Sequence, residues 1–210
     1  MYEFIKDTVN PLAGRCPHDC SYCYVKDLKK RFPAIREKYS GELRLCEKTM
    51  KKNLGNGKTL FVCSCNDLFA EDVNSHHLFA ILRWLKEYDN TYYFQTKNPG
   101  RLSRLIPNLP EKKILCVTLE SDRMMNVPTY ILADMADACH LQITIEPIRE
   151  FDLEAFCSIL RFIKPAQVNI GANTSKIKLI EPSPEKVHSL ISELEKFTKV
   201  HLKDNLKRLL

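Results

Sequence analysis

The sequence predicts an α/β protein whose parallel strands alternate with helices in a partial (β/α)6 barrel, open on one side. Two observations lead to this fold class. Short β-branched or aromatic runs alternate with amphipathic segments, and successive runs begin about one βα unit apart. The chain has 210 residues, whereas a closed barrel of eight units needs about 250. Six units therefore suit the length better than eight.

Six runs are predicted to be strands of one sheet. They are Thr8–Leu12, Thr59–Cys63, Tyr92–Thr96, Ile114–Leu119, Leu141–Ile145 and Gln167–Ile170. Parallel strands joined by helices require right-handed crossovers. In the long connection after the first strand, Glu42–Cys46 is predicted to be a short extra strand.

Three segments between the strands have the periodicity of amphipathic helices. Their apolar stripes are Leu78, Ile81, Leu82 and Leu85; Leu153, Phe156, Leu160 and Ile163; and Val187, Leu190, Ile191 and Leu194. Asp152 can cap the second helix, and Ser183 followed by Pro184 is a start signal for the third. No repeat, low-complexity tract or linker interrupts the pattern, so residues 1–210 are predicted to form a single domain.

The composition is that of an ordinary globular protein, with 44% hydrophobic and 28% charged residues. No apolar run reaches the roughly 20 residues that span a bilayer, and the first residues lack the blocks of a signal peptide. A cytoplasmic location without a membrane partner is therefore expected. Nine cysteines suit a reducing compartment. The net charge of +6 permits a polyanionic partner without requiring one.

The sequence from Cys16 to Cys23 contains three cysteines in a C-x3-C-x2-C arrangement, with the second at Cys20. Ferredoxin-type 4Fe-4S clusters take four cysteine ligands, but the next cysteine here is Cys46, far along the chain. Three thiolates would leave one iron open to a small molecule. The alternatives are a zinc site that includes His18, or cysteines that only pack. Zinc prefers four ligands in two close pairs, so the spacing favours the cluster.

This spacing, with Tyr22 directly before Cys23, resembles the signature of the radical SAM superfamily. Four further motifs resemble its spore photoproduct lyase branch and the compact, phage-associated relatives of that enzyme. They are Cys-Ser-x-x-Asp-Leu-Phe from Cys63, Thr-Lys-x-Pro from Thr96, Thr-x-Glu from Thr118 and Ile-Glu-Pro from Ile145. Together the motifs span about residues 8 to 175.

The resemblance implies that Cys16, Cys20 and Cys23 hold a 4Fe-4S cluster whose open iron is chelated by S-adenosylmethionine. Reductive cleavage of S-adenosylmethionine gives a 5'-deoxyadenosyl radical, which abstracts hydrogen from a substrate. A flavodoxin or ferredoxin is implied as electron donor. A nucleic acid or nucleotide is the favoured substrate class. The alternatives are a peptide-modifying radical SAM enzyme and a non-catalytic iron-sulfur or zinc binding module.

Polar residues follow each predicted strand, where the sites of parallel α/β proteins form. Lys97 suits the carboxylate of S-adenosylmethionine, and Asn66 or Ser64 its amino group. Thr118, Glu120 or Ser121 suits the ribose or the carboxylate, and Ile170 with the glycine after it suits the adenine.

The resemblance adds three residues to the candidate site. It implies contacts from Tyr22 and Tyr24 to S-adenosylmethionine, and a hydrogen-donating cysteine for which Cys65 is the candidate. The chain lacks the Gly-Gly-Glu motif of many radical SAM groups after the second strand. It also lacks the segments that the full-length lyase places around its DNA lesion, so the cofactor chemistry carries over well but repair of thymine dimers carries over poorly.

Overall fold

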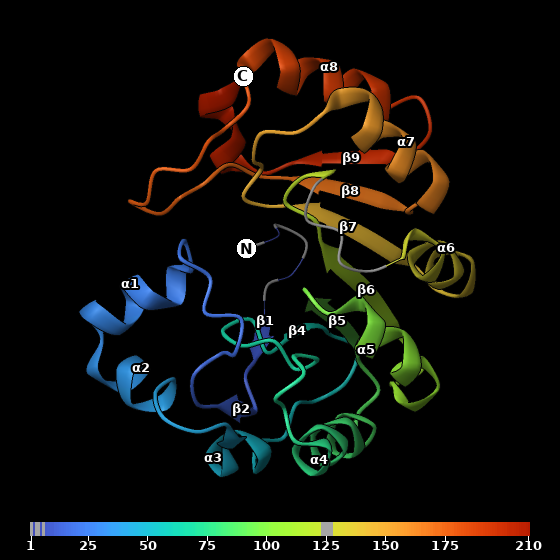
Figure 1. Cartoon of the computed structure of the whole chain (residues 1–210). Helices are drawn as coiled ribbons and strands as arrows, with labels where there is room; N and C mark the ends of the chain where they lie inside the picture. Colours follow the sequence, from blue (N-terminus) through green and yellow to red (C-terminus); the bar gives the residue numbers. More distant parts are fainter. Residues whose placement is uncertain (1, 3–4, 6, 123–127) are drawn as a thin grey trace. The chain divides into compact units, whose positions relative to one another are not determined.

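The computed structural model describes residues 2, 5, 7–122 and 128–210. The chain divides into two compact units, Met1–Ile114 and Leu115–Leu210. Figure 1 traces both in sequence colours, from blue at the N-terminus to red at the C-terminus. The single domain predicted from the sequence stays a prediction.

The first unit is built on three parallel strands in the order β1 (Asp7–Val9), β4 (Thr59–Val62) and β5 (Thr91–Thr96). Val62 pairs with Val9 on one side and with Phe94 on the other. Two short strands, β2 (Leu12–Ala13) and β3 (Arg44–Leu45), form a separate antiparallel pair. The helices are α1 (Tyr24–Arg31), α2 (Pro33–Lys38), α3 (Glu47–Met50), α4 (Ser75–Leu85), α5 (Pro99–Leu105) and the 3-10 turn η1 (Ile106–Asn108).

Strands β1 and β4 end earlier than predicted. The strand expected over Thr8–Leu12 is divided into β1 and β2, because Pro11 between them has no N–H to donate to a ladder. Strand β4 ends at Val62 rather than Cys63, because Cys63 has φ of +58°, in the left-handed region that strands do not use. The extra strand predicted over Glu42–Cys46 is confirmed as β3.

The second unit contains four parallel strands in the order β6 (Lys113–Thr118), β7 (Leu141–Ile145), β8 (Gln167–Ile170) and β9 (Lys199–Leu202). The first two residues of β6 belong to the first unit. The helices are α6 (Thr129–Ala138), α7 (Leu153–Ile163), α8 (Pro184–Leu194) and the 3-10 segment η3 (Asp204–Leu209). Helices α7 and α8 lie on the same side of β8 and β9 (Figure 1).

The predicted helix starts of the second unit are confirmed. The side chain of Asp152 accepts a hydrogen bond from the N–H of Ala155 at 2.8 Å, and that of Ser183 accepts one from Lys186 at 3.3 Å. Each bond satisfies an N–H that has no partner inside the helix.

The α/β class with parallel strands is confirmed, but the described chain has seven parallel strands where six were expected. The seventh, β9, pairs with β8 along the register Val168 to Val200. It lies at the edge of the sheet and its residues are half-buried or exposed. A Lys-Val-His-Leu stretch has too few apolar residues to be recognised as a strand.

The strands carry the core of each unit. Leu60, Val62, Tyr92 and Phe94 are buried in the first, where the rings of Phe69 and Phe94 lie 5.7 Å apart. Every residue of β7 and β8 is buried in the second, as expected of central parallel strands. Of the helices in 7–122 and 128–210, none has the length and apolar character needed to cross a lipid bilayer.

Gly14 lies where the chain enters the cysteine loop, and both its backbone conformation and its close neighbours exclude a side chain there. Its φ is +97°, and an added Cβ would collide with the Glu42 carbonyl and lie 2.7 Å from Leu43 Cα. We expect Gly14→Ala to lower the free energy of unfolding by more than about 3 kcal/mol, measured by urea denaturation.

Gly57→Ala is the matched control, since Gly57 has φ of +73° but no neighbour within 4 Å of an added Cβ. It carries only the cost of the left-handed backbone, about 1–2 kcal/mol. Equal losses in the two variants would show that the contact with Glu42 does not matter.

Candidate functional site

The cysteine loop, residues 16–23, connects β2 to α1 in the first unit. Two turns fold it: the N–H of Asp19 donates to the carbonyl of Cys16 at 3.3 Å, and that of Cys23 to the carbonyl of Cys20 at 3.2 Å. Asp19 has φ of +43°, a conformation that Asp tolerates better than most residues. Cys23 is the N-cap of α1. The local turns therefore gather three cysteines into one short segment.

All three cysteines of the loop are free thiols of intermediate exposure. Burial raises the pKa of Cys16 and of Cys23, and the neighbouring Cys20 thiol adds to this. Backbone N–H groups act in the opposite direction, from His18 and Asp67 on Cys16 and from Val25 and Lys26 on Cys23. Such N–H groups favour the thiolate form, which is the form that binds metal.

The loop is predicted to hold either a 4Fe-4S cluster on three thiolates or a zinc site that includes His18. In the described part of the chain, no three His, Cys, Asp or Glu side chains are grouped as ligands of one metal ion. A cubic cluster places each thiolate on a different iron, so its ligands need not converge on one point. His18, the fourth ligand of the zinc alternative, directs its Nε2 to Asp67 Oδ2 at 2.7 Å. The structure therefore shows one ring nitrogen of His18 held by Asp67, and the choice between a cluster and a zinc ion stays a prediction.

The main chain and the side chain of Lys97 are both engaged by the segments around the loop. Its N–H donates to Asp67 Oδ2 at 2.9 Å. Its Nζ donates to the hydroxyl of Tyr22 at 2.5 Å and lies 5.2 Å from the centre of the Tyr22 ring. The structure thus brings together Lys97 and Tyr22, two residues predicted to bind the same cofactor from distant parts of the sequence.

Asn66 is buried, with 8% of its surface exposed. Its Nδ2 donates to the carbonyl of Gly14 at 3.0 Å. Its Oδ1 is buried and has no hydrogen-bond partner within the described residues. An unsatisfied buried acceptor is costly, so this oxygen is suited to a donor from a bound molecule.

Cys65 lies among hydroxyl groups. Its sulfur is 3.7 Å from the hydroxyl of Tyr24 and 3.8 Å from that of Ser64. Burial raises the pKa of Tyr24 and of Tyr39, and in both cases the Cys65 thiol adds to the shift. The Ser64 hydroxyl donates to Asn10 Oδ1 at 3.3 Å, and the Ser64 carbonyl accepts a hydrogen bond from the Tyr24 hydroxyl at 2.7 Å.

Cys63 and Cys65 do not follow the alternation of a strand, because β4 ends before both of them. Cys63 is 3% exposed, and burial raises the pKa of its thiol to about 12. Cys65 has intermediate exposure. Of these two cysteines, only Cys65 is accessible enough for the predicted hydrogen-donating role.

The remaining predicted residues belong to strand ends of the second unit. Thr118 is the last residue of β6, and Glu120 beyond it is 2% exposed with its carboxylate 3.6 Å from Arg149. Ile170, the last residue of β8, is fully buried. Ser121, the alternative to Glu120, is also buried. Their contacts with a cofactor stay predictions.

The sequence interpretation did not identify Asp67 as a site residue. Its carboxylate accepts from His18, Lys97, Thr96 and Phe69, and it is 7% exposed. A buried carboxylate in the middle of a recognised motif was the available signal. Its partners were not readable, because they come from separate loops.

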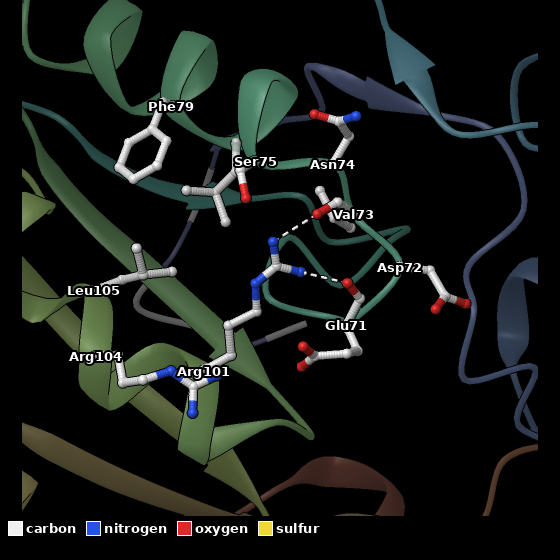
Figure 2. A pocket seen from close by; sticks show the side chains of 10 residues that line it. Glu71, Asp72, Val73, Asn74, Ser75, Phe79, Arg101, Arg104 and Leu105 are labelled. Atoms are coloured by element: carbon white, nitrogen blue, oxygen red, sulfur yellow. Dashed lines mark hydrogen bonds between the residues drawn. The ribbon is translucent and has the colours of Figure 1, made fainter.

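A cavity of about 630 Å³ in the first unit contains none of the predicted site residues. Figure 2 shows the Arg101 guanidinium in it, bonded to the carbonyl oxygens of Glu71 and Val73 at 2.9 and 2.5 Å. Glu71 also accepts from Asn98 at 3.0 Å. These hydrogen bonds connect the loop after β4 to the start of α5, so Arg101 has a structural role.

A family model described as "Protein of unknown function (DUF5131)" matches residues 1–163. The chain belongs to the DUF5131 family. No curated protein sequence matches this DUF5131 protein.

Solved structures of spore photoproduct lyase share the fold of the DUF5131 protein. A double mutant with bound AdoMet and dinucleoside spore photoproduct aligns with a TM-score of 0.60 and 12% identity over 96% of this chain and 78% of the lyase. The lyase complexed with dinucleoside spore photoproduct aligns with a TM-score of 0.57 and 12% identity over 91% of this chain and 74% of the lyase. SuiB of Streptococcus suis, solved with its precursor peptide SuiA, has a TM-score of 0.48 and 10% identity over 95% of this chain and 49% of SuiB. The resemblance predicted from the motifs is confirmed for the fold, which is shared with spore photoproduct lyase.

The cysteines of the DUF5131 protein should differ sharply in reactivity at pH 7.5. The raised pKa keeps Cys63 protonated and burial hides it, whereas hydrogen bonds from Thr49 and the charge of Lys38 lower the pKa of Cys46. Because the thiolate is the nucleophile, we expect Cys46 to react with iodoacetamide at least about a hundredfold faster than Cys63 in the native protein. Mass spectrometry of tryptic peptides measures both rates. Similar native rates would contradict the burial of Cys63, and equal rates in urea provide the control.

Proposed function

We propose that this DUF5131 protein is a radical SAM enzyme that binds a 4Fe-4S cluster and cleaves S-adenosylmethionine reductively. One observation carries the proposal. Three reduced cysteines share a loop whose Tyr22 contacts Lys97, the residue predicted to hold the cofactor's carboxylate. The fold shared with spore photoproduct lyase supports it, although a fold alone does not determine an activity.

In this proposal Cys16, Cys20 and Cys23 are the cluster ligands. When bound, the cluster supplies the electron that cleaves S-adenosylmethionine to methionine and a 5'-deoxyadenosyl radical. Burial raises the pKa of the Cys16 and Cys23 thiols, and the backbone N–H groups around them act in the opposite direction, toward the thiolates that ligation requires. A reducing partner such as flavodoxin or ferredoxin is part of the proposal.

The polar groups beside the loop match the two charged groups of the methionyl moiety. Lys97 is a cation at a strand end, suited to the carboxylate. The Asn66 Oδ1 is a buried acceptor without a partner in the described chain, suited to the ammonium. Tyr22 orients the Lys97 ammonium through its hydroxyl. Tyr24, at the start of α1, donates its hydroxyl to the carbonyl of Ser64 and keeps its proposed contact with S-adenosylmethionine. Ser64 is the alternative partner for the ammonium.

Cys65 is proposed as the hydrogen donor that quenches the product radical. Its thiol is more accessible than that of Cys63 and lies beside the Tyr24 hydroxyl. Thr118 and Glu120 keep their proposed roles toward the ribose or carboxylate, and Ile170 toward the adenine. A nucleic acid or nucleotide is the proposed substrate class. It is supported by the dinucleoside in the lyase structures and by the net charge of +6.

The test is anaerobic reconstitution with iron and sulfide, then reduction by dithionite with S-adenosylmethionine and quantification of 5'-deoxyadenosine. About four irons per chain and formation of 5'-deoxyadenosine are expected. A protein that takes up zinc and no iron would instead be a zinc binding module. Iron uptake without cleavage, even after nucleotides and nucleic acids are added, would leave a non-catalytic iron-sulfur module.

Cys20→Ala should abolish cluster binding, because two thiolates cannot replace three. Cys139→Ala is the matched control, since Cys139 ends α6 in the other unit. We expect the 4Fe-4S absorbance to disappear in the first variant and to persist in the second. Circular dichroism checks that both remain folded. Undiminished iron in Cys20→Ala would overturn the ligand assignment.

Lys97→Ala and Asn66→Ala should each weaken the binding of S-adenosylmethionine while the cluster is retained. A hydrogen bond to a charged group contributes about 1.5–3 kcal/mol, so the loss should be at least about tenfold in each variant. Titration of the reconstituted protein with S-adenosylmethionine measures it. Lys112→Ala, which removes an exposed lysine paired with Asp89, is the control and should bind as the wild type does.

A further inference from the structure

Asp67 accepts four hydrogen bonds in the first unit. Its Oδ2 accepts from His18 Nε2 at 2.7 Å, from Thr96 Oγ1 at 2.9 Å and from the Lys97 N–H at 2.9 Å. Its Oδ1 accepts from the Phe69 N–H at 2.9 Å. Only 9% of the side chain is exposed. Because water has little access, none of these donors is easily satisfied if the carboxylate is removed.

The geometry points to Asp67 as a positioning residue that couples the cysteine loop to Lys97, an inference that rests on the proposed function. One carboxylate oxygen holds His18, inside the loop, and also the backbone N–H of Lys97. The position of the cysteines and that of the lysine are thereby fixed by the same atom.

A purely local role would use the carboxylate differently. The bond from Phe69 to Oδ1 closes a turn within the loop after β4, and it would suffice if Asp67 only shaped that loop. The three bonds to Oδ2 come instead from residues 29, 30 and 49 positions away in sequence. Oδ2 therefore joins separate segments.

The contact between Tyr22 and Lys97 completes a closed path of interactions. From His18 the path runs through Asp67 to the backbone of Lys97, and from its Nζ to the hydroxyl of Tyr22, back in the cysteine loop. Each of the two bonded connections restricts the other. Breaking the connection at Asp67 would remove the bonds that join His18 to the backbone of Lys97, whereas the contact between the Tyr22 hydroxyl and the Lys97 Nζ does not depend on that carboxylate.

Two substitutions test the hydrogen bonds to the Asp67 carboxylate separately. Asp67→Asn keeps the size of the side chain but removes its negative charge, so the bonds from His18, Thr96 and Lys97 to the remaining oxygen lose their charge assistance and weaken. His18→Ala removes the hydrogen bond between the cysteine loop and Asp67 and leaves the bonds from Thr96 and Lys97. Glu71→Gln is the matched control, because it neutralises an exposed carboxylate of the same loop.

Hydrogen exchange of the metal-free protein tests the coupling without any cofactor. We expect amides of residues 14–23 to exchange about tenfold faster in Asp67→Asn and in His18→Ala, and at the wild-type rate in Glu71→Gln. The double variant that combines Asp67→Asn with His18→Ala should exchange no faster than the faster single variant, since both act on the contact between His18 and Asp67. Wild-type exchange in Asp67→Asn, or additive effects in the double variant, would overturn the proposal. If Asp67→Asn does not fold, unchanged exchange in His18→Ala overturns it instead.

Electron paramagnetic resonance of the reconstituted, reduced proteins tests the consequence for the cofactor. The wild-type spectrum should change on addition of S-adenosylmethionine, and in Asp67→Asn the concentration for half the change should rise about tenfold while iron content is unchanged. An equal concentration in both proteins would reject the positioning role and leave the proposed function intact. A wild type that binds no iron or does not respond would reject the proposed function, while hydrogen exchange still decides whether Asp67 couples the segments.

Discussion

Parallel pairing of β1, β4 and β5 is the constraint on which the chemistry of the first unit depends. Because the three strands run in one direction, the segments that follow them emerge at one edge of the sheet. The register through Val9, Val62 and Phe94 fixes how far each strand reaches. The cysteine loop, the Asn66–Asp67 segment and Lys97 all lie beyond that edge. Tyr22 and Lys97, 75 positions apart in sequence, are thereby brought into contact.

The loops beyond the strands are held by a few polar contacts and by unusual backbone conformations. Asp67 accepts hydrogen bonds from two other segments, and Gly14 approaches Glu42 and Leu43 too closely for any side chain. The left-handed residues Asp19 and Cys63 turn the chain sharply at the loop and directly after β4. Such conformations are unfavourable in isolation and persist only where the surrounding structure fixes them. Rigid placement of the loop is what three thiolates need if they are to meet one cluster.

The fold of spore photoproduct lyase is retained at 12% identity, and this limits what the similarity means. Burial of apolar residues in parallel strands is compatible with many sequences, so an architecture can persist while its surface changes. The features that argue for shared cofactor chemistry are instead individual groups: three free thiols, the buried Asn66 oxygen and Lys97 beside Tyr22. None of these groups specifies the substrate.

The sequence alone determined the α/β class, most strand positions and the candidate ligands, because these depend on local periodicity and on the spacing within eight consecutive residues. It also located the caps at Asp152 and Ser183, which act within one helical turn. It did not reveal β9, whose stability comes from pairing with β8 rather than from its own apolar pattern. Nor did it reveal the end of β4 at Val62 or the partners of Asp67. Those were decided by tertiary structure, because the hydrogen bonds of a buried carboxylate depend on which distant segments the sheet brings beside it.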